Sequence, residues 1–163
     1  MYQAGKFKCI GLIIWIIFVG CSGTTDPSTP DRIGKKERLR LVSGQQAAQV
    51  VNRMHGQSVA TDANVIAEYG NGDDKDILYI SRYAESEAAQ KAFDLMIVKM
   101  KDAGKSPFYH LRPIGKYHKK AYITLGMGAV HYIYRSGSHL LWFQTYQPFG
   151  AELPPQLLDF YPL

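Results

Sequence analysis

Apolar and polar positions along this chain repeat with two different periods. Apolar residues at three-and-four spacing predict helices over residues 44–55 and 85–103, each followed by a glycine. A short third helix is expected over residues 153–160, with its prolines in the first turn. Alternating or compact apolar runs predict six strands, over residues 59–69, 77–83, 108–111, 121–125, 129–135 and 139–147.

The order of these segments predicts the fold class. A helix, two strands, a second helix, about four strands and a short helix follow one another. Only the connection through the central helix is long enough to be a parallel crossover. We therefore expect an α+β fold, with a mainly antiparallel sheet of five or six strands and helices packed on one face.

The first 21 residues do not belong to this pattern. Lys6 and Lys8 precede an uncharged apolar run over residues 9–19, which ends at Gly20 and Cys21. This three-part layout predicts a secretory signal peptide. As a helix, the run would be about 16 Å long at ~1.5 Å per residue, whereas the ~30 Å bilayer core needs ~20 residues. A transmembrane helix is therefore the weaker interpretation.

The end of this run, Phe18-Val19-Gly20-Cys21, resembles the lipobox of bacterial lipoproteins, with Phe18 where leucine is usual. The resemblance covers residues 1–21 and implies cleavage before Cys21 and the attachment of two or three acyl chains to it. Two or more chains would anchor the protein stably in a membrane. In that family Ser22, in place of aspartate, implies the outer membrane in organisms that have one. The alternative is an ordinary or uncleaved secretory signal, with Cys21 an incidental thiol.

Cleavage would divide the chain into three parts. Residues 1–20 are the signal peptide, residues 21–40 an acylated cysteine with a flexible basic tether, and residues 41–163 a single α+β domain. Most of the net charge of +5 lies outside that domain, which has twelve basic and eleven acidic residues. A nearly neutral domain argues against a nucleic-acid partner. The basic residues of the tether would lie either near anionic headgroups or in solvent.

No arrangement of residues predicts catalysis or metal binding. Joined by a two-residue turn at Ser136-Gly137, which sets His131 opposite Trp142, the last two strands would place His131 and His139 on opposite faces of the sheet. With a three-residue turn the two histidines would share a face but lie about 13 Å apart, too far to share a metal. His110 and His118 flank a loop, and after removal of the signal no cysteine is left in the domain to complete a zinc site. We expect no catalytic residue, no metal and no cofactor.

Two surface sets remain as candidate binding sites. The loop before residue 121 is basic and could contact an anionic partner such as lipid phosphate or polysaccharide. Its candidate contact residues are Arg112, Lys116, His118, Lys119 and Lys120.

The last two strands form the second set, because both of their faces are partly apolar. A sheet with one solvated face should alternate more cleanly. The second face should therefore be covered by the terminal segments, by an envelope protein partner or by a second copy of the chain. Its candidate contact residues are His131, Trp142 and Tyr146.

These observations favour a lipid-anchored protein of the bacterial cell envelope that faces the periplasm or the exterior. Its small extracytoplasmic domain would be a non-catalytic binding or assembly module. The alternatives are a hydrolase of envelope polymers and a carrier that holds a small ligand on the aromatic sheet. A hydrolase would need His131, His139 or residues 110–120 gathered in one deep pocket.

Overall fold

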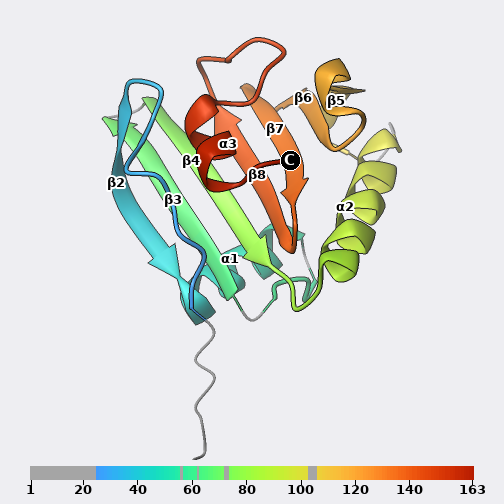
Figure 1. The fold of residues 1–163 in the computed structure, drawn as a ribbon, viewed down its shortest axis with the longest axis horizontal. Coiled ribbons are helices and arrows are strands. Elements are labelled where there is room, and N and C mark those ends of the chain that lie inside the picture. The colour runs from blue at the N-terminus through green and yellow to red at the C-terminus, as the bar shows by residue number, and fades with distance from the viewer. Residues whose placement is uncertain (1–24, 56, 62, 72–73, 103–105) are drawn as a thin grey trace, which may run out of the picture.

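The computed structural model describes residues 25–163, apart from residues 56, 62, 72–73 and 103–105. Its centre is one antiparallel sheet of eight strands in the order β1-β2-β3-β4-β8-β7-β6-β5, curled into a half-barrel (Figure 1). The strands are β1 Arg32–Ile33, β2 Lys36–Ser43, β3 Ala63–Asn71, β4 Asp74–Arg82, β5 Phe108–Pro113, β6 Ala121–Gly126, β7 Ala129–Ser136 and β8 His139–Thr145. The helices are α1 Gly44–His55, α2 Ser86–Lys101 and α3 Pro155–Phe160, with a 3-10 turn, η1, at Gly115–Tyr117.

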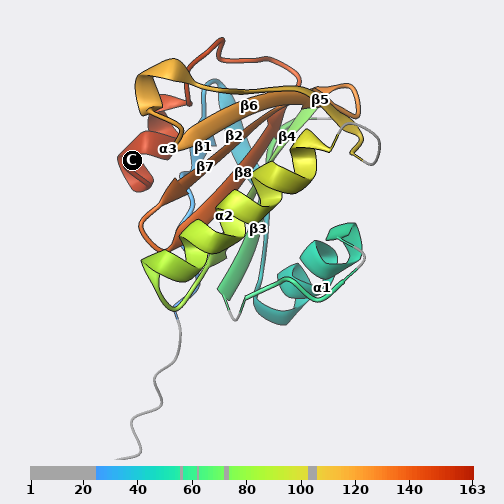
Figure 2. The ribbon, with the colours of Figure 1, turned by 90° about the vertical axis from the view of Figure 1, so that its right-hand side faces the viewer.

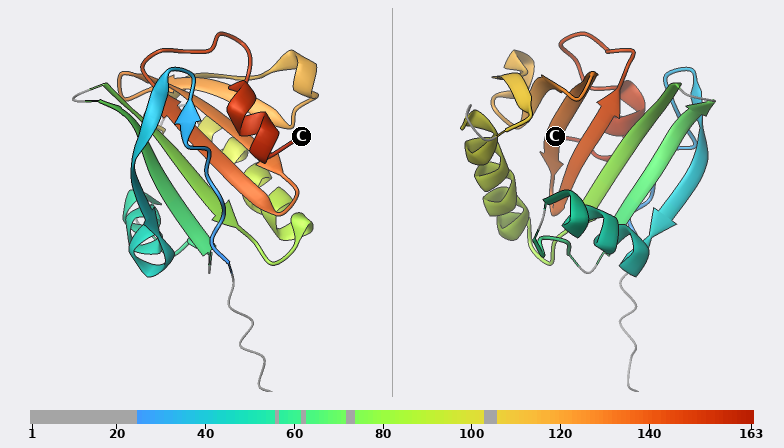
Figure 3. Two further views of the ribbon diagram at one scale, coloured as in Figure 1. Left: turned by 60° about the vertical axis from the view of Figure 1, so that its left-hand side comes forward. Right: turned by 180° about the vertical axis from the view of Figure 1, so that it is seen from behind.

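The expected fold class was wrong in two respects. The sheet has eight strands, not five or six, and the helices do not share one face. Figures 2 and 3 show α1 and α2 on one side of the sheet and α3 on the other. With three short helices beside eight strands, the described chain is mostly β.

The two additional strands, β1 and β2, lie in the stretch that the sequence assigned to the tether and its junction with the domain. β2 has the sequence K-E-R-L-R-L-V-S and lies near the edge of the sheet. An edge strand can keep charged side chains in water, so it does not need the apolar alternation that marks an inner strand. The folded part of the chain therefore starts well before residue 41.

Most of the other elements lie where the periodicity placed them. Helix α1 has the expected bounds, and the six expected strands all form. The β7–β8 hairpin has a two-residue turn, at Gly137–Ser138, so that Ser136 lies opposite His139 and His131 opposite Gln144. This register differs from the expected one by two residues. Because side chains alternate with period two, each residue keeps its predicted face.

The face carrying α1 and α2 is called here the helix face. Helix α2 places Phe93, Ile97 and Met100 against Tyr122 and Ile133 of the sheet. Beside it, helix α1 has its own smaller apolar cluster on strand β3, formed by Ala47, Val51 and Ile66.

The opposite face is called here the terminal-segment face, because both ends of the described chain cover it. The N-terminal segment, residues 25–33, and the C-terminal segment, residues 146–163 with α3, pack over it. Its core is larger than that of the helix face and includes four buried tyrosines, Tyr69, Tyr132 and Tyr134 of the sheet and Tyr161 of the C-terminal segment.

Within the part of the chain that the structure describes, no helix is long and apolar enough to cross a membrane.

Candidate functional site

The N-terminal segment is held against the terminal-segment face by hydrogen bonds from tyrosine side chains. The hydroxyl of Tyr69 donates to the carbonyl of Pro30 at 2.9 Å. The hydroxyl of Tyr161 donates to the carbonyl of Ser28 at 2.6 Å. An irregular segment forms few hydrogen bonds within its own backbone. The two tyrosine hydroxyls therefore bond carbonyls of the segment that would otherwise be covered without a partner. The segment is therefore fixed to the domain rather than free.

An arginine of strand β2 fixes the same segment from the other side. The Nη1 of Arg38 donates to both the carbonyl and the hydroxyl of Thr29, at 2.9 and 2.6 Å. Its Nη2 pairs with Asp31 at 2.8 Å. Two residues further, Ile33 is fully buried in the core. Sequence reasoning missed this attachment because it assigned the polar, proline-containing stretch to a tether.

The two tyrosines donate because they stay protonated. Burial raises the pKa of Tyr69 to about 12, and the nearby Thr29 and Arg38 lower it only in part. Burial also raises the pKa of Tyr161, against the opposing effect of its bond to Ser28. Both phenols therefore remain donors at physiological pH.

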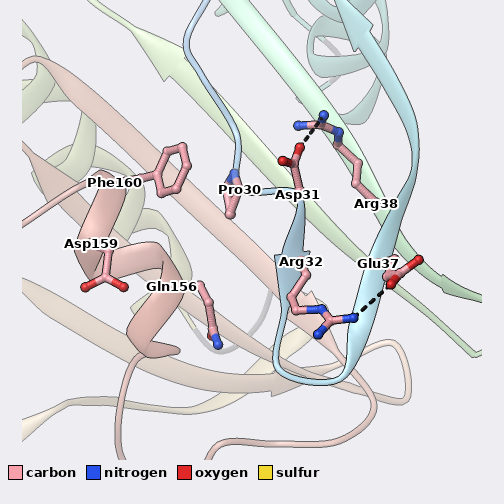
Figure 4. A pocket seen from close by; sticks show the side chains of 8 residues that line it. All are labelled: Pro30, Asp31, Arg32, Glu37, Arg38, Gln156, Asp159 and Phe160. Atoms are coloured by element: carbon pink, nitrogen blue, oxygen red, sulfur yellow. Dashed lines mark hydrogen bonds and ion pairs between the residues drawn. The ribbon is translucent and has the colours of Figure 1, made fainter.

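A pocket of about 580 Å³ lies between the N-terminal segment, strand β2 and helix α3 (Figure 4). Its charged side chains largely pair with each other, Arg32 with Glu37 and Arg38 with Asp31, each at 2.8 Å. Such a lining offers hydrogen bonds to a polar ligand but pairs no nucleophile with a base. The lining residues are Pro30, Asp31, Arg32, Glu37, Arg38, Gln156, Asp159 and Phe160.

The predicted basic loop forms the end of β5 and its connection to β6, at one tip of the molecule. All five candidate residues are exposed there: Arg112, Lys116, His118, Lys119 and Lys120. This group is called here the basic tip.

One cation of the basic tip is already paired. Lys116 lies 2.8 Å from Glu152, and this hydrogen bond raises its pKa. His118 and Lys119 have left-handed backbone angles, with φ of 48° and 64°, which turn the chain back toward β6. The tip thus presents its remaining cations on a tight turn.

The candidate partner face is covered from within the chain. His131 is fully buried, and both of its ring nitrogens are bonded. Its Nδ1 accepts from the indole nitrogen of Trp142 at 2.9 Å, and its Nε2 lies 2.9 Å from the carbonyl of Gly126. This pattern assigns the proton to Nε2. Phe108 closes the site with an edge contact to His131 at 5.0 Å between ring centroids.

Burial lowers the pKa of His131, opposed only by its bond to Gly126, so the ring is a neutral core group. His131 therefore does not reach the surface to contact a partner. Trp142 is partly buried beside it, and of the three candidates only Tyr146, at the end of β8, is exposed.

The other histidines lie apart from His131. His139 is on the terminal-segment face and packs on Tyr161, with ring centroids 5.0 Å apart. Burial and the charge of Arg82 lower its pKa. His110 and His118 are exposed. Across the described residues, no group of three or more histidine, cysteine or acidic side chains could hold a metal ion.

A buried ion cluster was not expected. Lys36 Nζ lies 2.7 Å from a carboxylate oxygen of Asp74 and 2.8 Å from one of Asp76. The side chain of Asp76 is only 3 % exposed. The signal was present in the sequence: Asp76 alternates with Leu78 and Ile80, the inward residues of β4.

Comparisons with known proteins found no relative: no family model, no curated protein and no solved structure matches the chain. The predicted lipid attachment site, Cys21, lies outside the described residues.

Proposed function

We propose that the chain is a lipid-anchored protein of the bacterial cell envelope, and that its folded domain binds a partner without catalysing a reaction. The observation that carries the proposal is the uncharged apolar run that ends in Gly20-Cys21 directly ahead of the folded chain. Such a run followed by a small residue and cysteine is typical of a cleaved signal with a lipid attachment site.

The geometry of the domain supports a binding role in two ways. The histidines that a hydrolase could use lie on different parts of the fold: His131 is a bonded core residue, and His139 lies on the opposite face. The basic tip, in contrast, presents exposed cations from one short connection. Such a cluster suits a polyanionic partner, for example a phosphate-bearing or carboxylate-bearing envelope polymer.

The anchor is tested by mass spectrometry of the mature protein, isolated from membranes of a bacterium that processes lipoproteins. We expect a chain that begins at Cys21 and carries acyl groups. The matched control is Cys21→Ser, which should leave the membrane fraction. An unmodified Cys21, or a chain that still begins at Met1, would overturn the anchor.

The binding role needs a second experiment. The anchored protein is crosslinked in intact cells, and the captured material is compared with that of a Lys119→Glu/Lys120→Glu variant. We expect the variant to lose the capture of anionic material while it unfolds at the same temperature as the wild type, because both side chains are exposed. Equal capture by both proteins would remove the basic tip from the proposal.

A further inference from the structure

The fixed N-terminal segment makes the link between anchor and domain much shorter than its sequence indicates. Among the residues that the structure describes, Pro27 is the first that is buried, and it lies only six positions after Cys21. From Pro27 onward the chain is held by the bonds to Ser28, Thr29 and Pro30 described above. What looked like a tether of twenty residues is reduced to these six positions.

The length of this link limits how far the domain can stand from the bilayer. Six residues span at most about 20 Å when fully extended, and an average of about 13 Å as a flexible chain. About 5–8 Å of this length is taken up by the headgroup layer. A folded chain of this size is about 35 Å across. Even fully extended, the link therefore leaves at most about 12–15 Å between the headgroup layer and the point where the chain enters the domain, which is less than half the width of the domain.

The link also determines which end of the domain faces the membrane. The described chain begins at the end of the molecule where β2 and β4 finish and where α1 lies, as Figures 1 and 2 show. This end is called here the anchor end. The basic tip, with η1, lies toward the opposite end in both views.

The surface of α1 suits the headgroup layer. The helix has no acidic residue, and its exposed side carries Gln45, Gln46, Gln49 and Arg53. Amides and a guanidinium donate hydrogen bonds to lipid phosphates, and no carboxylate on this helix opposes an anionic surface.

We propose that the short link seats the domain on its own bilayer, with α1 against the lipid headgroups and the basic tip facing away. The inference rests on the lipid anchor of the proposed function. It has a consequence for the partner of the basic tip, since the headgroups of the anchoring membrane are out of reach. That partner belongs to the space beyond the membrane.

The experiment uses the absence of other thiols. Once Cys21 is acylated, the mature chain has no free cysteine, so one introduced cysteine takes a fluorophore selectively. Gln49→Cys places the probe on the exposed side of α1, and Lys120→Cys places it on the basic tip. Each acylated protein is reconstituted in phosphatidylethanolamine and phosphatidylglycerol vesicles that carry a short-range quencher on their headgroups.

We expect the probe at position 49 to be quenched several-fold more strongly than the probe at position 120. Equal quenching, or stronger quenching at position 120, would overturn the seating. Acylation of the same samples is measured by mass spectrometry. An acylated protein without the difference overturns only the seating, whereas a protein that is not acylated overturns the anchor and the seating together.

A longer link is the matched control. Insertion of twenty glycine and serine residues after Ser22 raises the average reach to about 28 Å while leaving the acylated cysteine in place. The excess quenching at position 49 should then disappear. If it persists, the short link does not hold α1 at the membrane and the inference fails.

Discussion

The two faces of the curled sheet are covered by different kinds of chain, and their residues differ accordingly. On the helix face, α2 meets the sheet through hydrocarbon and ring contacts such as Phe93 on Tyr122, with ring centroids 5.8 Å apart. A helix satisfies its own backbone hydrogen bonds, so its covering residues need no polar atoms. The terminal-segment face is covered mostly by irregular chain, which has no such internal ladder.

Hydroxyl groups supply the missing partners on the terminal-segment face. Tyrosines of the sheet donate to a carbonyl of the covering chain at three places: Tyr69 to Pro30, Tyr132 to Gly150 at 2.9 Å and Tyr134 to Leu157 at 3.1 Å. Ser136 adds a fourth bond, to the carbonyl of Pro162. On the terminal-segment face, tyrosine hydroxyls therefore bond the covering chain, whereas Phe93, Ile97 and Met100 of α2 cover the helix face with apolar side chains.

The largest effect is expected from Lys36, the buried cation of the terminal-segment face. Burial opposes its charge, but hydrogen bonds to Asp74 and Asp76 outweigh this and raise its pKa. Lys36→Ala would leave the buried Asp76 without its cation, and should lower the free energy of unfolding in urea by about 3–5 kcal/mol.

The control for this variant is Arg32→Ala, which breaks an exposed ion pair with Glu37 and should cost less than about 1 kcal/mol. Similar losses for the two variants would show that the Lys36 cluster is no more than a surface pair. A Lys36→Met/Asp76→Leu double variant should recover much of the loss, because it removes both charges.

A smaller effect tests the role of the tyrosine hydroxyls directly. Tyr69→Phe removes the donor to the buried Pro30 carbonyl, and should lower the free energy of unfolding by about 1–3 kcal/mol. On the helix face, Tyr122→Phe removes a hydroxyl that has no hydrogen-bond partner among the described residues. This change should alter the free energy of unfolding by less than about 0.5 kcal/mol. Equal losses would contradict the difference between the two faces.

The smallest effect is a dependence of stability on pH, since each face carries one histidine removed from solvent, His131 fully and His139 in part. Burial lowers the pKa of His131 on the helix face and of His139 on the other. The unfolded chain therefore binds protons more readily than the folded one as the pH falls below 6.5. The free energy of unfolding is therefore highest above pH 6.5. Below that pH it falls by at most about 1.4 kcal/mol per pH unit for each histidine.

Urea unfolding between pH 7.5 and 5 measures this slope. His131→Gln keeps an acceptor and a donor in the ring's place, and should make the slope shallower even if it lowers stability at every pH. An unchanged slope would show that His131 takes up its proton as readily in the folded domain as in the unfolded chain.

The local pattern of apolar and polar residues predicted much of this fold, because most of its helices and strands depend on residues that are close together in the sequence. Helix α1 and the last hairpin are marked by apolar spacing and turn residues, which act over a few positions. Even with a register shift of two residues, the faces of His131 and Trp142 were predicted correctly, because alternation survives such a shift.

Contacts between distant residues decided the rest. The segment ahead of β1 reads as a polar tether because it is held by bonds from Arg38, Tyr69 and Tyr161, which lie up to 133 positions away from their partners. The same holds for Lys36 and its two carboxylates, which are 38 and 40 positions away. Contacts between residues so far apart produce no periodic pattern in the sequence.

The sequence by itself determined the features that depend on composition and on neighbouring residues: the uncharged apolar run that ends at Gly20-Cys21, the near neutrality of the domain and most of its strands. Only the tertiary structure decided where the domain begins, because that depends on whether a polar segment finds buried donors on a distant strand. The number of residues between the proposed lipid attachment site and the folded chain follows from those bonds, and composition could not reveal it.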